Sequence, residues 1–122
     1  MDGPFGADFY ENEQRVLLLA SGPGVGPAVA IAERALADGN EAAVLYRSDS
    51  PVHADRLDEL RDSGVTVEVT ADPIASNLDG LHTGDAGEQI FAYGFEDFVD
   101  EARAAIETVG GDPDAAKIEN FG

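Results

Sequence analysis

The chain has 122 residues, the size of one ordinary domain, and contains no cysteine, which excludes disulfides, thiolate metal sites and a cysteine nucleophile. Its 25 acidic residues outnumber the seven lysines and arginines and give a formal net charge of −18, so binding to nucleic acid or to an anionic membrane surface is not expected. The acids are spread along the chain, which is typical of a solvated acidic coat on a protein from a halophilic host. The alternative is a docking surface for a basic partner.

Nothing in the sequence predicts a membrane protein. No apolar run reaches the length of a membrane span, and no basic and apolar signal segment follows Met1. We therefore expect a cytoplasmic protein, and the absence of cysteine fits that expectation.

The first 14 residues are expected to form a lead-in, and residues 15–122 the single domain. In this domain the apolar run RVLLLA at 15–20 is typical of a buried central strand. A helical pattern follows over 28–37, with Pro27 in the first turn, where its missing N–H costs nothing. The run EAAVLY at 41–46 is expected to form the second strand.

The second half of the chain continues the alternation of helices and strands. We expect a helix over 51–61, strands over 65–69 and 88–92, a helix over 96–109 and a last strand over 117–121. Residues 70–87 show no periodicity and are expected to form a long irregular loop. Because strands separated by helices form a parallel sheet with right-handed crossovers, the sequence predicts an α/β fold, a three-layer αβα sandwich around a five-stranded parallel sheet.

The segment SGPGVGP, residues 21–27, joins the first expected strand to the first helix. In an open parallel sheet, ligands bind beyond the carboxyl ends of the strands, where the strand order reverses. A glycine loop at that place lets a pyrophosphate approach the N-terminus of the following helix. The spacing matches neither G-x-G-x-x-G nor the P-loop pattern, so a phosphate loop and a ligand-free tight turn both stay open.

The other groups that carry chemistry are isolated. His53 and His82 have no metal-like spacing, no nucleophile elbow accompanies a serine, and no metal site or catalytic residue is assigned. Glu96 and Asp97 are expected to be acids at a helix N-terminus, which the helix dipole favours.

Four short stretches occur in a distinctive order: GPFG at 3–6, LLLASGPGVGP at 17–27, FAYGF at 91–95 and ENFG at 119–122. They resemble four features of the ferredoxin–NADP reductase-like flavoproteins. These are the turn that ends the flavin-binding barrel, the first strand and glycine loop of the NAD(P)-binding domain, its strand ending in Cys-Gly-Pro, and its C-terminal Glu-x-Phe-Gly. The resemblance implies the strand order 3-2-1-4-5 and the binding of NAD(P)H.

The resemblance also implies where the dinucleotide binds. The pyrophosphate is expected at the glycine loop, the adenosine ribose after the second strand and the nicotinamide after the fourth, at residues Gly22, Pro23, Gly24, Val25, Gly26, Pro27, Arg47, Ser48, Tyr93, Gly94 and Phe95. Arg47 could pair with a 2′-phosphate, or it could be a surface arginine that balances Asp49 and Asp55. The choice between NADH and NADPH stays open.

Three residues depart from the pattern of the family. Pro23 replaces a threonine, Tyr93 replaces the cysteine and Phe95 replaces the proline. In the family that threonine and cysteine lie against the nicotinamide, and a bulky Tyr93 would fill space that the ring needs. The pyrophosphate half of the site is therefore expected to be retained, and the half that supports hydride transfer is expected to be altered.

The resemblance does not extend to a flavin-binding barrel, because the arginine-aromatic-serine motif of that barrel has no counterpart here. FAD or FMN is therefore expected in a domain outside this chain or in a partner subunit. One hypothesis is the pyridine-nucleotide domain of a flavin-dependent oxidoreductase. The other is a non-catalytic nucleotide-sensing or interaction module in which Pro23 and Tyr93 close the hydride site.

Overall fold

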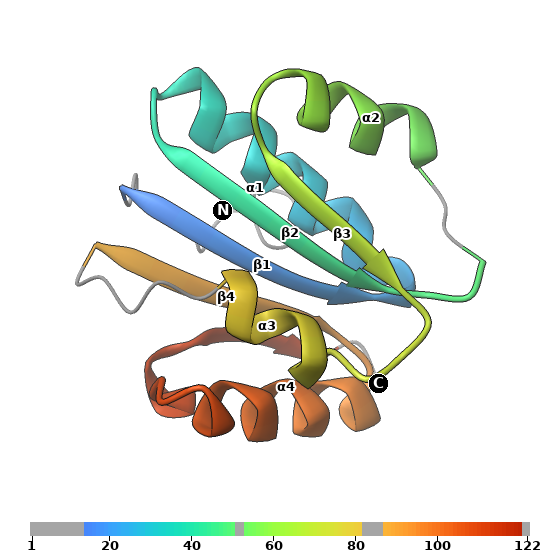
Figure 1. The fold of residues 1–122 in the computed structure, drawn as a ribbon, viewed down its shortest axis with the longest axis vertical. Coiled ribbons are helices and arrows are strands. Elements are labelled where there is room, and N and C mark those ends of the chain that lie inside the picture. The colour runs from blue at the N-terminus through green and yellow to red at the C-terminus, as the bar shows by residue number, and fades with distance from the viewer. Residues whose placement is uncertain (1–13, 51–52, 82–86, 121–122) are drawn as a thin grey trace.

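The computed structural model describes residues 14–50, 53–81 and 87–120, and strands alternate with helices along the chain (Figure 1). The strands are β1 Arg15–Ser21, β2 Glu41–Arg47, β3 Thr66–Thr70, β4 Glu88–Gly94 and β5 Lys117–Asn120. The helices are α1 Val25–Ala37, α2 Ala54–Asp62, α3 Ala75–Leu81 and α4 Glu96–Thr108, with 3-10 turns η2 Gly22–Gly24 and η3 Pro113–Ala115.

The five strands form one parallel sheet in the order β3-β2-β1-β4-β5, so the predicted α/β class and strand order are confirmed. Helices α1 and α2 cover one face of the sheet, and α3 and α4 cover the other (Figure 1). The strand order reverses at β1, which pairs with β2 on one side and with β4 on the other. A ligand site is expected where the carboxyl ends of these strands meet.

The core has two parts because β1 is buried on both faces. Val16, Leu18 and Ala20 join the cluster under α1 and α2, whereas Leu17 and Leu19 join the cluster under α3 and α4. All five side chains are inaccessible to solvent. This two-sided burial explains why β1 reads as a continuous apolar run and not as an alternating one.

The expectation of an irregular loop over 70–87 was wrong for part of that segment, because α3 occupies Ala75–Leu81. Ile74, Leu78 and Leu81 are buried in the cluster under α3 and α4. Their spacing of four and then three residues is the signal that identifies a helix. Residues 1–13 of the expected lead-in over 1–14, His82 and the final Phe-Gly of ENFG lie outside the described residues.

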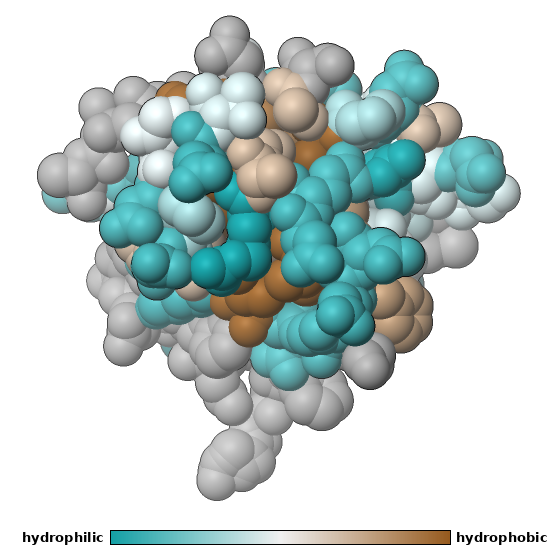
Figure 2. Space-filling model, turned by 90° about the horizontal axis from the view of Figure 1, so that it is seen from below, coloured by the Kyte–Doolittle hydropathy of each residue, from teal (hydrophilic) through white to brown (hydrophobic). Residues whose placement is uncertain are grey.

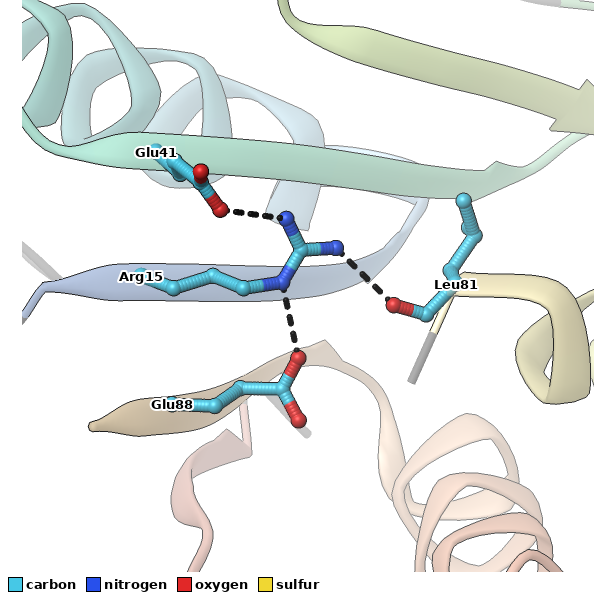
Figure 3. A network of polar contacts seen from close by, with 4 residues as sticks. All are labelled: Arg15, Glu41, Leu81 and Glu88. Carbon is cyan, nitrogen blue, oxygen red and sulfur yellow. Dashed lines mark hydrogen bonds and ion pairs between the residues drawn. The ribbon is translucent and has the colours of Figure 1, made fainter. Parts of the chain in front are cut away.

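Arg15, at the start of β1, connects three elements (Figure 3). Its Nε donates to Glu88 of β4 at 2.9 Å, one Nη donates to Glu41 of β2 at 3.3 Å, and the other donates to the Leu81 carbonyl at the end of α3 at 2.9 Å. The Arg15 side chain is 18% exposed and that of Glu88 only 2%. Arg15 therefore fixes the amino ends of the three central strands against α3.

Every arginine of the chain forms an ion pair with an acid, at Arg15, Arg34, Arg47, Arg56, Arg61 and Arg103. Arg56 of α2, for example, donates two hydrogen bonds to Glu33 of α1, and the bond to Glu33 raises the pKa of the Arg56 guanidinium. With the cations engaged in this way, most of the 25 acids have no basic side chain to balance them. Hydrophilic side chains also dominate the face on the α4 side, where they surround a small hydrophobic area (Figure 2).

The free energy of unfolding is expected to rise with salt, because the net charge of −18 makes the folded chain repel itself. The screening length falls from about 10 Å at 0.1 M to about 3 Å at 1 M salt. We expect a gain of about 1 kcal/mol, or roughly 4 °C in Tm, measured by thermal denaturation in KCl. Sucrose at matched osmolality is the control, and a Tm that KCl raises no more than sucrose does would contradict the expectation.

None of the helices among the described residues is both long enough and apolar enough to cross a membrane.

Candidate functional site

The turn from β1 into α1 is shaped by two glycines. Gly22 has a φ of +57°, the left-handed region in which glycine is favoured. Gly24 packs so closely on β4 that a Cβ added there would lie 2.1 Å from the Tyr93 carbonyl oxygen. Both positions therefore require glycine for the fold itself, whether or not a ligand binds.

Gly26, the second residue of α1, differs from these two glycines. A Cβ added to it would meet nothing within 4 Å, so the packing of the described residues gives no reason for glycine there. Val25 beside it is buried in the core, and Pro27 is half-buried in the first turn of the helix. Open space at Gly26 is what a ligand that approaches the backbone would need.

The N-terminus of α1 is open to an anion. No side chain caps it through a hydrogen bond, and its first turn contains no acid. The first turns of α2 and α4, by contrast, carry Asp55, Glu96 and Asp97. The first-turn N–H groups of a helix lack partners within the helix and attract negative charge. In so acidic a chain, α1 thus combines these donors with a first turn that contains no carboxylate.

A cleft of about 440 Å³ lies at the carboxyl ends of the strands. Its lining residues come from the ends of β1 and β2, from the segment after β3 and from the start of α4, and they are Ser21, Arg47, Ser48, Asp49, Ala71, Phe95, Asp97, Phe98 and Glu101. Clefts of this size hold small molecules and cofactors in other proteins. The cleft therefore occupies the position that the strand reversal predicts for a ligand.

Arg47 is held at the edge of this cleft by an acid distant in sequence. Its guanidinium donates a hydrogen bond to Glu101 of α4, in an ion pair. The other carboxylate oxygen of Glu101 accepts from the backbone N–H of Ile74 at 2.7 Å. The expected alternatives for Arg47 were a phosphate or balancing acids at Asp49 and Asp55, whereas the partner in the structure is Glu101.

Phe95 stands at the junction of the glycine turn and the cleft. Phe95 is 51% exposed, and its Cε2 lies 3.7 Å from the place a Cβ on Gly22 would take. The neighbouring Gly94 faces α4, since a Cβ there would lie 2.7 Å from Cδ2 of Phe98. An exposed aromatic ring beside a cleft offers a flat surface on which another ring can stack.

Tyr93 occupies a different place from Phe95. Its side chain is fully buried in the cluster under α1 and α2, where its ring stacks on Phe91 with centroids 6.4 Å apart. Tyr93 is not among the residues that line the cleft. The tyrosine therefore supports η2 and α1 from within the core.

The predicted site residues thus separate into three groups. Arg47, Ser48 and Phe95 line the cleft, and Gly22 does not line it but lies next to the ring of Phe95. Gly24, Val25, Tyr93 and Gly94 are buried in the fold around it. Gly26 and Pro27 are half-buried in the first turn of α1. The side chain of Pro23, the remaining predicted residue, is not among those described.

His53 is the one histidine among the described residues, and it is exposed and lies just before α2. Across residues 14–50, 53–81 and 87–120, no group of three His, Cys, Asp or Glu side chains gathers closely enough to hold a metal ion.

Three solved structures resemble this chain over most of its length. Cytochrome P450 reductase GcoB from Amycolatopsis matches 97% of this chain with a TM-score of 0.71 and 19% identity. Flavohemoglobin from Malassezia yamatoensis, with bound FAD and heme, matches 98% with a TM-score of 0.72 and 19% identity. Full-length CYP116B46 from Tepidiphilus thermophilus matches 92% with a TM-score of 0.65 and 27% identity.

These matches define the class of fold. The chain has the fold of the NAD(P)-binding domain of ferredoxin–NADP reductase-like proteins, as its four sequence stretches indicated. The chain spans only part of each neighbour: 40% of the length of GcoB, 35% of the flavohemoglobin and 15% of CYP116B46. No protein-family model and no curated protein matches the sequence.

Proposed function

We propose that this chain is the pyridine-nucleotide-binding domain of a flavin-dependent oxidoreductase. The observation that carries the proposal is the cleft at the carboxyl ends of the strands, beside the reversal between β1 and β4 and next to the glycine turn that leads into α1. In parallel α/β sheets this is where dinucleotides bind.

The residues around the cleft fit the parts of a dinucleotide. The open first turn of α1 suits a pyrophosphate. Arg47 and Ser48, at the end of β2, offer hydrogen-bonding groups for the adenosine ribose. On the opposite side of the cleft, β4 ends at Gly94 and is followed by the exposed Phe95, on whose ring a nicotinamide would stack.

NAD(P)H supplies a hydride, and the flavin that receives it belongs to a domain or partner outside this chain. Within the proposed function the chain itself binds and orients the dinucleotide. The length of the structural neighbours supports the proposal that the flavin is bound outside this chain, because each neighbour extends well beyond the part that this chain matches.

Calorimetric titration with NADH and with NADPH tests the proposal. Replacing Gly26 with valine is expected to weaken binding by about tenfold or more, because its side chain enters the space that a pyrophosphate needs. Ala37→Val places the same valine side chain at an exposed position at the far end of α1 and should leave affinity unchanged. Equal affinities in Gly26→Val and the original chain would contradict the pyrophosphate site.

Binding of neither nucleotide by a chain with a folded circular dichroism spectrum would overturn the proposed function. Where a nucleotide does bind, a flavoprotein partner is added and the bleaching of its flavin absorbance is followed. Binding without bleaching by a candidate partner would favour the non-catalytic nucleotide-sensing module instead.

A further inference from the structure

Among the described residues, Arg47 is the cation that lines the cleft, and its charge is already neutralised by an acid. Its side chain is 37% exposed, and its guanidinium pairs with Glu101, whose side chain is 19% exposed. Glu101 is fixed from a second direction by the Ile74 N–H at 2.7 Å. Two partners, Arg47 of β2 and the Ile74 N–H just before α3, therefore hold this carboxylate in place.

The other charged residues of the cleft are negative. Asp49 and Asp97 also line it, so the described part of the lining contains one arginine and three acids. A phosphate monoester carries a charge of about −1.5 to −2 at neutral pH and would enter a site whose formal charges already sum to a negative value. A ribose hydroxyl, by contrast, can donate a hydrogen bond to a carboxylate.

The position of the charged residues in the sheet indicates which part of a bound dinucleotide they would contact. Arg47 ends the second strand, and Ser48 and Asp49 follow it. The residue that reads the 2′ position of the adenosine ribose lies at about this point in dinucleotide-binding sheets. An acid at that point favours a free 2′-hydroxyl, and an unpaired arginine favours a 2′-phosphate.

We infer that the cleft selects a dinucleotide with a free 2′-hydroxyl, NADH over NADPH, and that Glu101 determines this specificity by occupying Arg47. This inference rests on the proposed function, since it names the ligand of the same site. Glu101 lies on α4, far in sequence from the glycine loop and from the end of β2, and it acts through Arg47 rather than by touching the nicotinamide.

Calorimetric titration of the chain with NADH and NADPH at fixed ionic strength tests the inference. The original chain is expected to bind NADH about tenfold or more tightly than NADPH. Glu101→Gln frees the guanidinium while the amide oxygen can still accept from the Ile74 N–H, so affinity for NADPH should rise about tenfold. Affinity for NADH should change by less than about threefold, because the change leaves Ser48 and Asp49 in place.

Two further variants make the result specific. Asp100→Asn removes the same charge from the neighbouring exposed position of α4, which does not line the cleft, and should leave the ratio of the two affinities unchanged. Arg47→Met combined with Glu101→Gln should abolish the gain for NADPH, because that gain depends on the freed guanidinium. Circular dichroism checks each fold, and if Glu101→Gln does not fold, Asp49→Asn is expected to shift the ratio in the same direction.

The outcomes separate the two proposals. Binding of neither nucleotide overturns the proposed function, and the inference with it. Equal binding of both nucleotides by the original chain overturns the inference alone, as does a ratio that neither Glu101→Gln nor Asp49→Asn changes.

Discussion

Replacing Gly24 with alanine is expected to destabilise the chain by about 3 kcal/mol. The added Cβ would lie 2.1 Å from the Tyr93 carbonyl oxygen and 2.6 Å from the carbonyl carbon. Neither atom can move away easily, because Tyr93 is part of β4, which is paired with β1 on one side and with β5 on the other. Urea denaturation followed by circular dichroism measures the free energy of unfolding.

Gly26→Ala is the matched control for this substitution. The same methyl group is added two residues later, in the first turn of α1, where the new Cβ would meet nothing within 4 Å. Alanine is the better helix former, so the free energy of unfolding should rise by about 0.5–1 kcal/mol. Opposite signs for the two variants are expected, and an unchanged stability of Gly24→Ala would refute the close packing of η2 on β4.

Replacing Arg15 with methionine is expected to cost about 3–5 kcal/mol. The methionine keeps much of the aliphatic stem but removes the ion pair with Glu88, whose side chain is only 2% exposed. It also removes the bond to the Leu81 carbonyl that secures the end of α3. Chemical denaturation of the variant and of the original chain gives the difference in the free energy of unfolding.

The neighbouring acid Glu41 provides the comparison. Its side chain is 75% exposed, so Glu41→Gln should cost less than about 1 kcal/mol even though it removes an ion pair to the same arginine. The double variant Arg15→Met, Glu88→Gln should recover part of the lost free energy of unfolding. In that variant the buried side chain at position 88 no longer carries the negative charge that Arg15 balanced. Equal costs for Arg15→Met and Glu41→Gln would show that burial of Glu88 is not what makes the network important.

Much of the fold could be predicted from local patterns. The apolar run of β1 identified a strand buried on both faces, and glycines after α1, α2 and α4 marked where those helices end. The helix α3 was missed because it is short and contains Asn77 and Gly80, which are typical of turns. Its apolar spacing at Ile74, Leu78 and Leu81 was present but covers only two turns.

The site was harder to predict, because its geometry depends on residues far apart in the chain. The end of β2 and the glycine turn were identified from their positions after strands. Glu101 was not, since it lies 54 residues after Arg47 and looks like any other acid on an exposed helix. The burial of Tyr93 depends on the alternation of β4, in which Phe91 and Tyr93 face α1 while Ile90 and Ala92 face α4.

The central position of β1 also has a consequence for the order of folding. The segment from β1 to β3 is continuous in sequence, so its two strand pairings close short loops through α1 and α2. The pairing of β1 with β4 joins Arg15 to Glu88 and must close a much longer loop, at a greater cost in chain entropy. We expect the β1–β3 half to form first and to present an unpaired edge of β1 until β4 arrives, so the joining of the two halves sets the folding rate.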